Sequence, residues 1–443
     1  MRPDFANFFR AGTLQKRLIT FLTGSRLRRN LSTVAVGQIA AQLVVLAATP
    51  VLTRLYSPVD FALLTVFAGT LNLLLCVSTW RFEWSVPIAR RESLAAGCIT
   101  LGLLATVVVT VTGLGLYALG VQLPGEFTAL SDERWLVVPL ALAVTFGGID
   151  ALVQGWFTRS GDIRILAVAR FFQAITNVLV GIFLWFLLGE GQGLIWALLA
   201  GSVVSLLVGL SHARGLSSSL AAINASTLAA AMRHFRSAAT LSVASSIAQS
   251  VSTSLLPILL LFYHTPTEVG WFALANRLAI GPLGFVTQAV SQSFWAEAAQ
   301  MIHDNPLQLR ALYLKITRWL LLLALPLAAL CTLGPLFVGP LLGRENWTGA
   351  GWVLAAMAPL VVGWVVATPL NHLLAHGRAS WVLGWDVGRA IAIITTVAAT
   401  AHCGLSFVVT ILSMSLVALV CYGALIWLHL YSYANPARSH EPT

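Results

Sequence analysis

The stretch TPVLTRLYSPVDFA, residues 49–62, lies between two apolar segments that are each long enough to cross a membrane. A related pattern occurs in the second half of the chain, where Pro266-Thr267-Glu268-Val269-Gly270 corresponds to Pro58-Val59-Asp60-Phe61-Ala62. In both copies, proline is followed by any residue, an acid, an apolar residue and a small residue. Paired halves of this kind are typical of transporter folds. The sequence therefore predicts two related halves that face one another in a membrane.

The composition also indicates a membrane protein. Of the 443 residues, 58% are hydrophobic and only 9% are charged, and the mean hydropathy is +0.84. Soluble proteins usually carry about 25% charged residues. Because lipid offers the backbone no hydrogen-bond partners, we expect an all-α integral membrane protein with about twelve transmembrane helices. The expected spans are 31–52, 61–80, 95–119, 135–157, 165–188, 193–211, 238–262, 270–295, 317–342, 350–375, 380–400 and 405–430.

These spans divide the chain into two six-helix lobes. Residues 1–30 interleave aromatic and basic residues, which predicts an amphipathic segment on the cytoplasmic surface. Residues 31–211 form the expected first lobe, 212–237 a cytoplasmic linker, 238–430 the second lobe and 431–443 a cytoplasmic tail.

The distribution of basic residues orients this topology. Most of the 26 Lys and Arg residues fall in segments on the side of the termini, and only Arg54, Arg134 and Arg344 fall in loops on the other side. Cytoplasmic loops carry such an excess, so we expect both termini in the cytoplasm. Topology and anionic lipid contacts account for the net charge of +10 without a nucleic-acid partner.

Charges inside a membrane usually face a cavity or each other, and five charged residues stand out within the expected spans. They are Asp150, Arg170, Arg277, Asp386 and Arg389. Asp150 and Arg170 could pair across adjacent helices, and Asp386 and Arg389, three residues apart, could pair within one helix. For both pairs, a structural ion pair and a role in coupling or substrate binding remain open.

Arg277 differs from the other four because its own span contains no acidic neighbour. A guanidinium can bind a phosphate through two parallel hydrogen bonds. This position favours an anionic ligand in a water-filled cavity. Arg54 allows two interpretations: the exit mouth of such a cavity or a pairing with Asp60.

Amide side chains extend the list of candidate site residues. Gln38 and Gln42 are one turn apart on the first helix, Gln249 occupies the matching place on the seventh, and Asn72 lies on the second. Interhelical hydrogen bonds explain many amides of this kind, but a cavity that faces sugar hydroxyls would also use them. We find no catalytic constellation, phosphate-cradling glycine loop or metal-binding spacing, so we expect neither an enzyme nor a cofactor.

Several segments together resemble a known family. They are Gly37-Gln38, residues 52–61, Arg81-Phe82-Glu83 with Val86-Pro87, residues 269–277 and residues 347–352. The resemblance is to the O-antigen-flippase-like polysaccharide biosynthesis branch of the multidrug/oligosaccharidyl-lipid/polysaccharide exporter superfamily. Phe82 and Ala62 depart from it, since tyrosine and glycine would be more usual there.

The resemblance implies a V-shaped exporter fold in a bacterial inner membrane. It implies a flippase that moves a polyprenyl-pyrophosphate-linked oligosaccharide from the cytoplasmic to the periplasmic leaflet, for O-antigen, capsule or exopolysaccharide assembly. The expected partners are this lipid-linked oligosaccharide, membrane lipids and other polysaccharide-assembly proteins. Arg277, with Arg170 and Arg389, would offset the pyrophosphate charge, and Asp150, Asp386 and Glu83 are the candidate carboxylates for ion coupling.

Two alternatives remain. A drug antiporter of the same superfamily should have acids dominating its cavity, whereas embedded arginines here match or outnumber them. A membrane glycan polymerase or ligase would need a large outward loop, and the longest expected one has about fifteen residues.

Overall fold

The computed structural model describes residues 26–89, 91–120, 135–188, 191–301, 306–342, 345–367 and 379–434. The first half contains α2 (Arg26–Leu55), α3 (Pro58–Ser78), the short η2 (Phe82–Trp84), α4 (Glu92–Ala118), α5 (Val137–Ser160), α6 (Ile163–Leu188) and α7 (Gln192–His212). The second half follows α8 (Leu216–Ala221) and contains α9 (Ala225–Ser254), α10 (Leu256–Tyr263), α11 (Pro266–Met301), α12 (Pro306–Thr332), α13 (Gly334–Leu342), η4 (Glu345–Trp347), α14 (Thr348–Ala356), α15 (Ala358–Ala367), α16 (Ala379–His402) and α17 (Phe407–Ala434).

The described helices confirm the all-α membrane class. Nine of them are long and apolar enough to cross a membrane, and the pair 345–356 and 358–367, bent by 48°, makes a tenth. The predicted spans 238–262 and 270–295 correspond to α9 with α10 and to α11. Serines lower the apolar character of α9. The helices therefore follow the predicted order.

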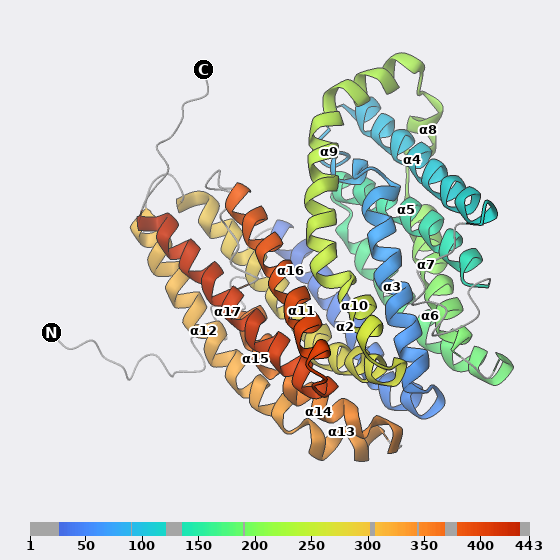
Figure 1. The fold of residues 1–443 in the computed structure, drawn as a ribbon. Coiled ribbons are helices and arrows are strands. Elements are labelled where there is room, and N and C mark those ends of the chain that lie inside the picture. Colours follow the sequence, from blue (N-terminus) through green and yellow to red (C-terminus); the bar gives the residue numbers. More distant parts are fainter. Residues whose placement is uncertain are drawn as a thin grey trace.

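The helices form the two arms of a V. Figure 1 shows α3 to α9 on one side and α12, α15, α16 and α17 on the other, with α2, α10 and α11 between them. We call the end of the molecule that carries the 55–58 and 263–266 connections the hairpin end, and the opposite end, where α8 joins α9, the linker end. The arms converge at the hairpin end, where α13 and α14 lie, and diverge toward the linker end (Figure 1). Helices α2 and α3 pack against α11, and α3 also packs against α9.

The repeated acid of the two hairpins caps a helix in both copies. The Asp60 carboxylate accepts from the Ser57 backbone N–H at 2.8 Å, and the Asp60 N–H donates to the Ser57 hydroxyl at 3.4 Å. Glu268 and Thr265 make the same two contacts, at 2.9 and 3.4 Å. Each pair is a capping box that satisfies backbone donors at the first turn of α3 or α11. The repeat thus encodes two equivalent helix starts.

The structure does not support the suggested pairing of Arg54 with Asp60. Arg54 is exposed at the end of α2. No ion pair joins these two side chains, and the Asp60 carboxylate is directed into its own capping box instead. A carboxylate that accepts from a backbone N–H at 2.8 Å and from a hydroxyl at 2.9 Å has little freedom to turn toward a neighbouring guanidinium.

The two capped helix starts touch at Gly270, which stands where the first copy has Ala62. A Cβ on Gly270 would overlap the carbonyl oxygen of Pro58. We expect Gly270→Ala to push the hairpins apart and to cost about 1–3 kcal/mol of stability, because overpacking displaces the backbone. Thermal unfolding in detergent measures this cost.

Gly115→Ala is the matched control, because no described atom lies within 4 Å of a Cβ at that exposed position of α4. It should unfold at the wild-type temperature or slightly above it, since alanine is the better helix former. Equal behaviour of the two variants would show that the contact between Gly270 and Pro58 does not hold the arms together.

Candidate functional site

Arg277 lies where α2, α3 and α11 meet, at the boundary between the two halves. Its guanidinium carbon is 5.9 Å from the centre of the Phe61 ring on α3. Its Nε is buried and has no hydrogen-bond partner in the described part of the chain. One turn further along α11, the amide nitrogen of Gln42 from α2 occupies the space beside Gly281. The fold therefore brings together an arginine without an acidic partner and a glutamine, both predicted as substrate-binding residues.

Trp347 closes the hairpin end next to this site. Its indole N–H donates to the carbonyl oxygen of Thr53 at 2.9 Å, across the boundary between the halves. Its ring meets Phe61 edge to face, with centroids 5.1 Å apart and planes at 82°. The neighbouring Trp271 donates from its indole to the carbonyl of Asn346 at 2.7 Å, which holds the η4 turn against α11. Phe61 therefore contacts both Trp347 and Arg277.

Tyr56 fixes the first hairpin to the rest of its own half. Its hydroxyl donates to the carbonyl of Gly181 on α6 at 2.7 Å. Burial, with a smaller contribution from the nearby Asp60 charge, raises the pKa of Tyr56 to about 12. The phenol therefore keeps its proton and remains a donor at any physiological pH.

Asp150 and Arg170 are connected through Gln154 and form no direct ion pair. The Gln154 amide donates to the Asp150 carboxylate at 2.5 Å, and its carbonyl oxygen accepts from Arg170 at 3.1 Å. Ser205 on α7 also donates to Asp150, at 3.2 Å, and Arg170 donates to Gln173 at 3.2 Å. Asp150 is buried, whereas Arg170 is exposed. The direct pairing that the sequence left open is therefore not formed, because Gln154, one turn from Asp150, lies between the two charges.

Asp386 and Arg389 form the ion pair that their spacing allows. The guanidinium lies 3.4 Å from the carboxylate, within one face of α16. It also sits 4.9 Å from the Trp385 ring centre and 5.8 Å from that of Tyr422 on α17. Two aromatic faces and one carboxylate surround this cation, so its charge is compensated inside the protein.

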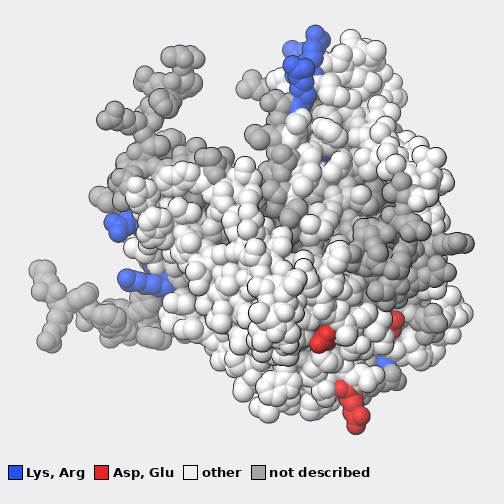
Figure 2. Space-filling view, in the orientation of Figure 1, with Lys and Arg blue, Asp and Glu red and all other residues white. Residues whose placement is uncertain are grey.

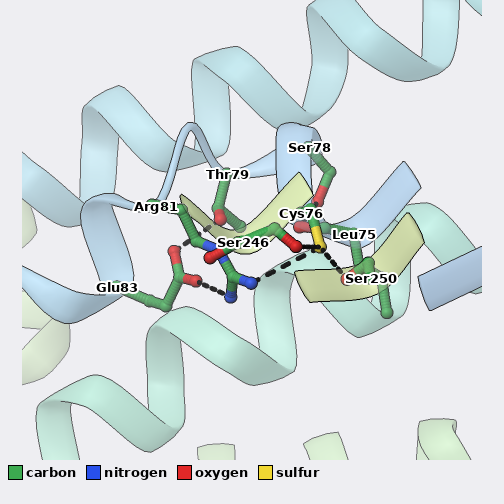
Figure 3. A network of polar contacts seen from close by, with 8 residues as sticks. All are labelled: Leu75, Cys76, Ser78, Thr79, Arg81, Glu83, Ser246 and Ser250. Carbon is green, nitrogen blue, oxygen red and sulfur yellow. Dashed lines mark hydrogen bonds and ion pairs between the residues drawn. The ribbon is translucent and has the colours of Figure 1, made fainter. Parts of the chain in front are cut away.

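Glu83 belongs to a polar network at the linker end of α3 (Figure 3). Its carboxylate accepts from Thr79 at 2.5 Å and from Arg81 at 3.2 Å. Arg81 also donates to the sulfur of Cys76 at 3.4 Å, and Cys76 lies 3.1 Å from the hydroxyl of Ser250 on α9. The backbone turns through Trp80 and Arg81 with φ of 51° and 58°, values that non-glycine residues rarely adopt. The network therefore anchors a strained turn and links α3 to α9.

For the other predicted residues, the structure gives the exposure of the side chain but no contact that assigns a role. Gln38 is half-buried on α2, Asn72 is exposed on α3 and Arg54 is exposed at the hairpin end. The side chain of Gln249 lies outside the described residues. Within the described ranges, no three His, Cys, Asp or Glu side chains could hold a metal ion together.

The sequence interpretation missed the structural roles of Phe61 and Cys76. Phe61 was read only as part of the hairpin repeat, although the apolar position after the acid recurs in both copies. Cys76 and Ser250 face each other between α3 and α9. Serines at positions 246, 250 and 254 of α9 were the available signal, because a small residue at every fourth position marks a close helix contact.

The Asp386–Arg389 pair yields a stability prediction. Asp386→Leu or Arg389→Met alone should destabilise the protein by about 3 kcal/mol, the low end for a buried pair since Asp386 keeps some exposure. The double variant should recover most of this loss, because it leaves no uncompensated charge. Thermal unfolding of the four proteins measures the coupling. A double variant as unstable as the worse single variant would show that the two charges do not stabilise each other.

Comparison with known proteins places this arrangement in a family. An inward-facing multidrug resistance MATE family transporter of the MOP superfamily has a TM-score of 0.62 at 16% identity, over 96% of this chain and 99% of that one. The lipid II flippase MurJ in an inward closed conformation has a TM-score of 0.71 at 11% identity, over 90% and 89%. A MOP superfamily transporter from Pyrococcus furiosus, whose binding pocket is described as having reversed polarity, has a TM-score of 0.58 at 15% identity, over 95% and 99%.

These likenesses show a shared fold. No curated protein sequence gives a significant match. The model of the family described as polysaccharide biosynthesis protein matches residues 27–295, which include α2 to α11 apart from the end of α11 and therefore both hairpins and Arg277. The chain belongs to the polysaccharide biosynthesis protein family.

Proposed function

We propose that this protein flips a polyprenyl-pyrophosphate-linked oligosaccharide across the bacterial inner membrane for surface polysaccharide assembly. The observation that carries this proposal is Arg277, whose buried Nε has no hydrogen-bond partner in the described residues and which lies at the boundary between the two halves. A pyrophosphate would supply the negative charge and the acceptor oxygens that Arg277 does not find within the protein. Gln42 of α2, which lies beside Gly281 one turn further along α11, would meet the phosphate or the first sugar.

The charge of this site favours a lipid-linked pyrophosphate over a cationic drug. None of the ion pairs in the described residues involves Arg277, and its nearest identified neighbour is an aromatic ring. A cationic substrate would face repulsion there with no carboxylate to offset it. Arg170 and Arg389 would contribute less, since Arg389 is already paired and Arg170 is held by two glutamines. The drug antiporter therefore remains the second candidate on fold alone.

The orientation in the membrane follows from surface charge. Figure 2 shows Lys and Arg mainly over α9 near the linker end and over α12, and Asp and Glu at the hairpin end. The positive-inside rule places the linker end in the cytoplasm. In this orientation both termini are cytoplasmic, and 31–211 and 238–430 act as the two moving lobes. Because the arms converge at the hairpin end, the conformation is closed to the periplasm.

Asp150 is the best candidate among the three carboxylates for proton coupling. Its hydrogen-bond donors are the neutral side chains of Gln154 and Ser205. Protonation of Asp386 or Glu83 would instead leave Arg389 or Arg81 without its carboxylate partner. The cost of an uncompensated buried cation makes these two carboxylates poor switches.

The orientation can be tested with a native cysteine. Cys403 is exposed in the turn between α16 and α17, and the adjacent His402 ring lies 5.8 Å from Tyr263 at the hairpin end. A membrane-impermeant maleimide should therefore label the protein in cells whose outer membrane is permeabilised, and Cys403→Ser should remove most of the label. In that background, Ser218→Cys, exposed on α8, should react only after the inner membrane is opened. The reverse pattern would invert the topology.

The central test replaces Arg277. Arg277→Ala should abolish surface glycan export, and Arg277→Lys should leave a small fraction, because an ammonium keeps the charge but loses the bidentate geometry. The loss of charge-assisted hydrogen bonds predicts a decrease of about 10- to 100-fold in affinity for a pyrophosphate ligand. Export is measured by surface glycan staining at matched protein levels.

Arg310→Ala, an exposed arginine at the start of α12, is the control and should export normally. Normal export by Arg277→Ala would remove Arg277 from the mechanism. Normal glycan export in a full deletion strain, together with new sensitivity to cationic drugs, would support the antiporter instead.

A further inference from the structure

Phe61 touches both the candidate binding arginine and the residue that closes the hairpin end. The Arg277 guanidinium approaches its ring centre to 5.9 Å, and Trp347 meets the ring edge to face at 5.1 Å. The three side chains come from α11, α3 and η4, and Phe61 itself is buried. One aromatic ring from the first half thus lies between two contacts made by the second half.

The two contacts differ in how easily they can be given up. A guanidinium at 5.9 Å is at the outer limit for a cation–π interaction, so an anion that offers hydrogen bonds can readily draw it away. The edge-to-face pair with Trp347 has ordinary geometry and a buried setting. A ligand at Arg277 would therefore first break the contact between the guanidinium and the Phe61 ring. The ring could then shift, and this shift would alter its contact with Trp347.

We call the hydrogen bond from the Trp347 indole to the Thr53 carbonyl the Trp347 latch. It depends on a backbone acceptor that the first hairpin leaves without a helical partner. The carbonyl of Thr53 is the acceptor that a continued helix would use for the N–H of Ser57. The Ser57 N–H donates instead to the Asp60 carboxylate at 2.8 Å. The Thr53 carbonyl is thus open to the Trp347 indole at 2.9 Å. Phe61 directly follows Asp60, so the cap, the acceptor of the Trp347 indole and the aromatic contact all lie within residues 53–61.

We propose that Phe61 couples anion binding at Arg277 to release of the Trp347 latch. This inference rests on the proposed function, since it takes the pyrophosphate group as the anion. Binding of the anion moves the guanidinium off the ring, Phe61 shifts toward the space so opened, and the edge-to-face contact with Trp347 is lost. The ligand then favours the conformation open at the hairpin end, because it binds more tightly when Arg277 is not held against Phe61.

Phe61 is thus a positioning residue whose effect must appear in the ligand response and not only in stability. Spin labels at Leu188→Cys and Leu341→Cys, both exposed near the hairpin end on opposite halves, report its opening by electron–electron distance measurement. The background carries Cys403→Ser and Cys421→Ser, since the other three cysteines are buried. The ligands are farnesyl pyrophosphate and inorganic pyrophosphate, added to the full-length protein in nanodiscs, and calorimetry measures their binding in parallel.

With Phe61 present, the distance between the spin labels at positions 188 and 341 should increase when pyrophosphate is bound. Phe61→Leu, which keeps an apolar side chain but no ring, should lose most of this shift while binding the ligand within about 3-fold of wild type, since a weak cation–π contact contributes little to affinity. Without ligand, the open fraction should rise about 3- to 10-fold, because the edge-to-face pair is lost. Phe61→Tyr, which keeps the ring, should restore the ligand response.

Phe67→Leu is the matched control, because Phe67 is equally buried on α3. It should lose a similar amount of packing but keep the ligand response. A full response in Phe61→Leu, or an equal loss in Phe67→Leu, would overturn the coupling. Binding that depends on Arg277 without any distance change would refute the coupling alone, and absence of such binding would refute the proposed function together with it.

Discussion

The contact between the two halves depends on how the hairpins terminate and restart their helices. A helix end leaves backbone donors and acceptors without partners, and at an interface these groups must be satisfied by side chains or by the opposite half. In the first hairpin, Asp60 takes the Ser57 donor, and Trp347 from the second half takes the Thr53 acceptor. The local rule of helix capping therefore determines where the halves can join. Gly270 then allows the second capped helix to approach Pro58 closely.

The contact between α3 and α9 follows a different rule. Small side chains line it: Gly69 lies against the backbone of Ser254, and Cys76 against Ser250. Small residues allow close helix approach without the interlocking of large side chains. An interface of this kind can slide at low cost, whereas the indole and proline contacts of the hairpin end must separate as a unit. Figure 1 shows α9 beside α3, so this contact holds the first helix of the second half against the arm formed by the first half.

The sequence predicted the fold class, the order of the helices and the equivalence of the two hairpins, because these depend on apolar length and local repeats. It could not predict which polar groups meet. Asp150 and Arg170 are linked through Gln154, because the Gln154 amide, one turn from Asp150, donates to its carboxylate and accepts from Arg170. The repeated acid was read as a topological marker with a charge to pair, and its use as a cap depends on hydrogen-bond geometry at the first turn. Trp347 is far from Thr53 in the chain, so their contact needed the fold.

The arginines show why one position stands apart. Arg81, Arg170 and Arg389 each donate to an oxygen or sulfur acceptor within 3.5 Å, so each has its charge or its donors at least partly compensated by the protein. Arg277 has none in the described structure and rests against a ring. Leaving a buried charged donor unsatisfied costs more than a weak cation–π contact returns. A protein can keep such a residue if a ligand supplies the missing acceptors during part of its cycle. The lack of acceptors at Arg277 destabilises the protein when no ligand is bound. Because a bound anion would supply those acceptors, it could bind one conformation more tightly than the other and so drive a conformational change.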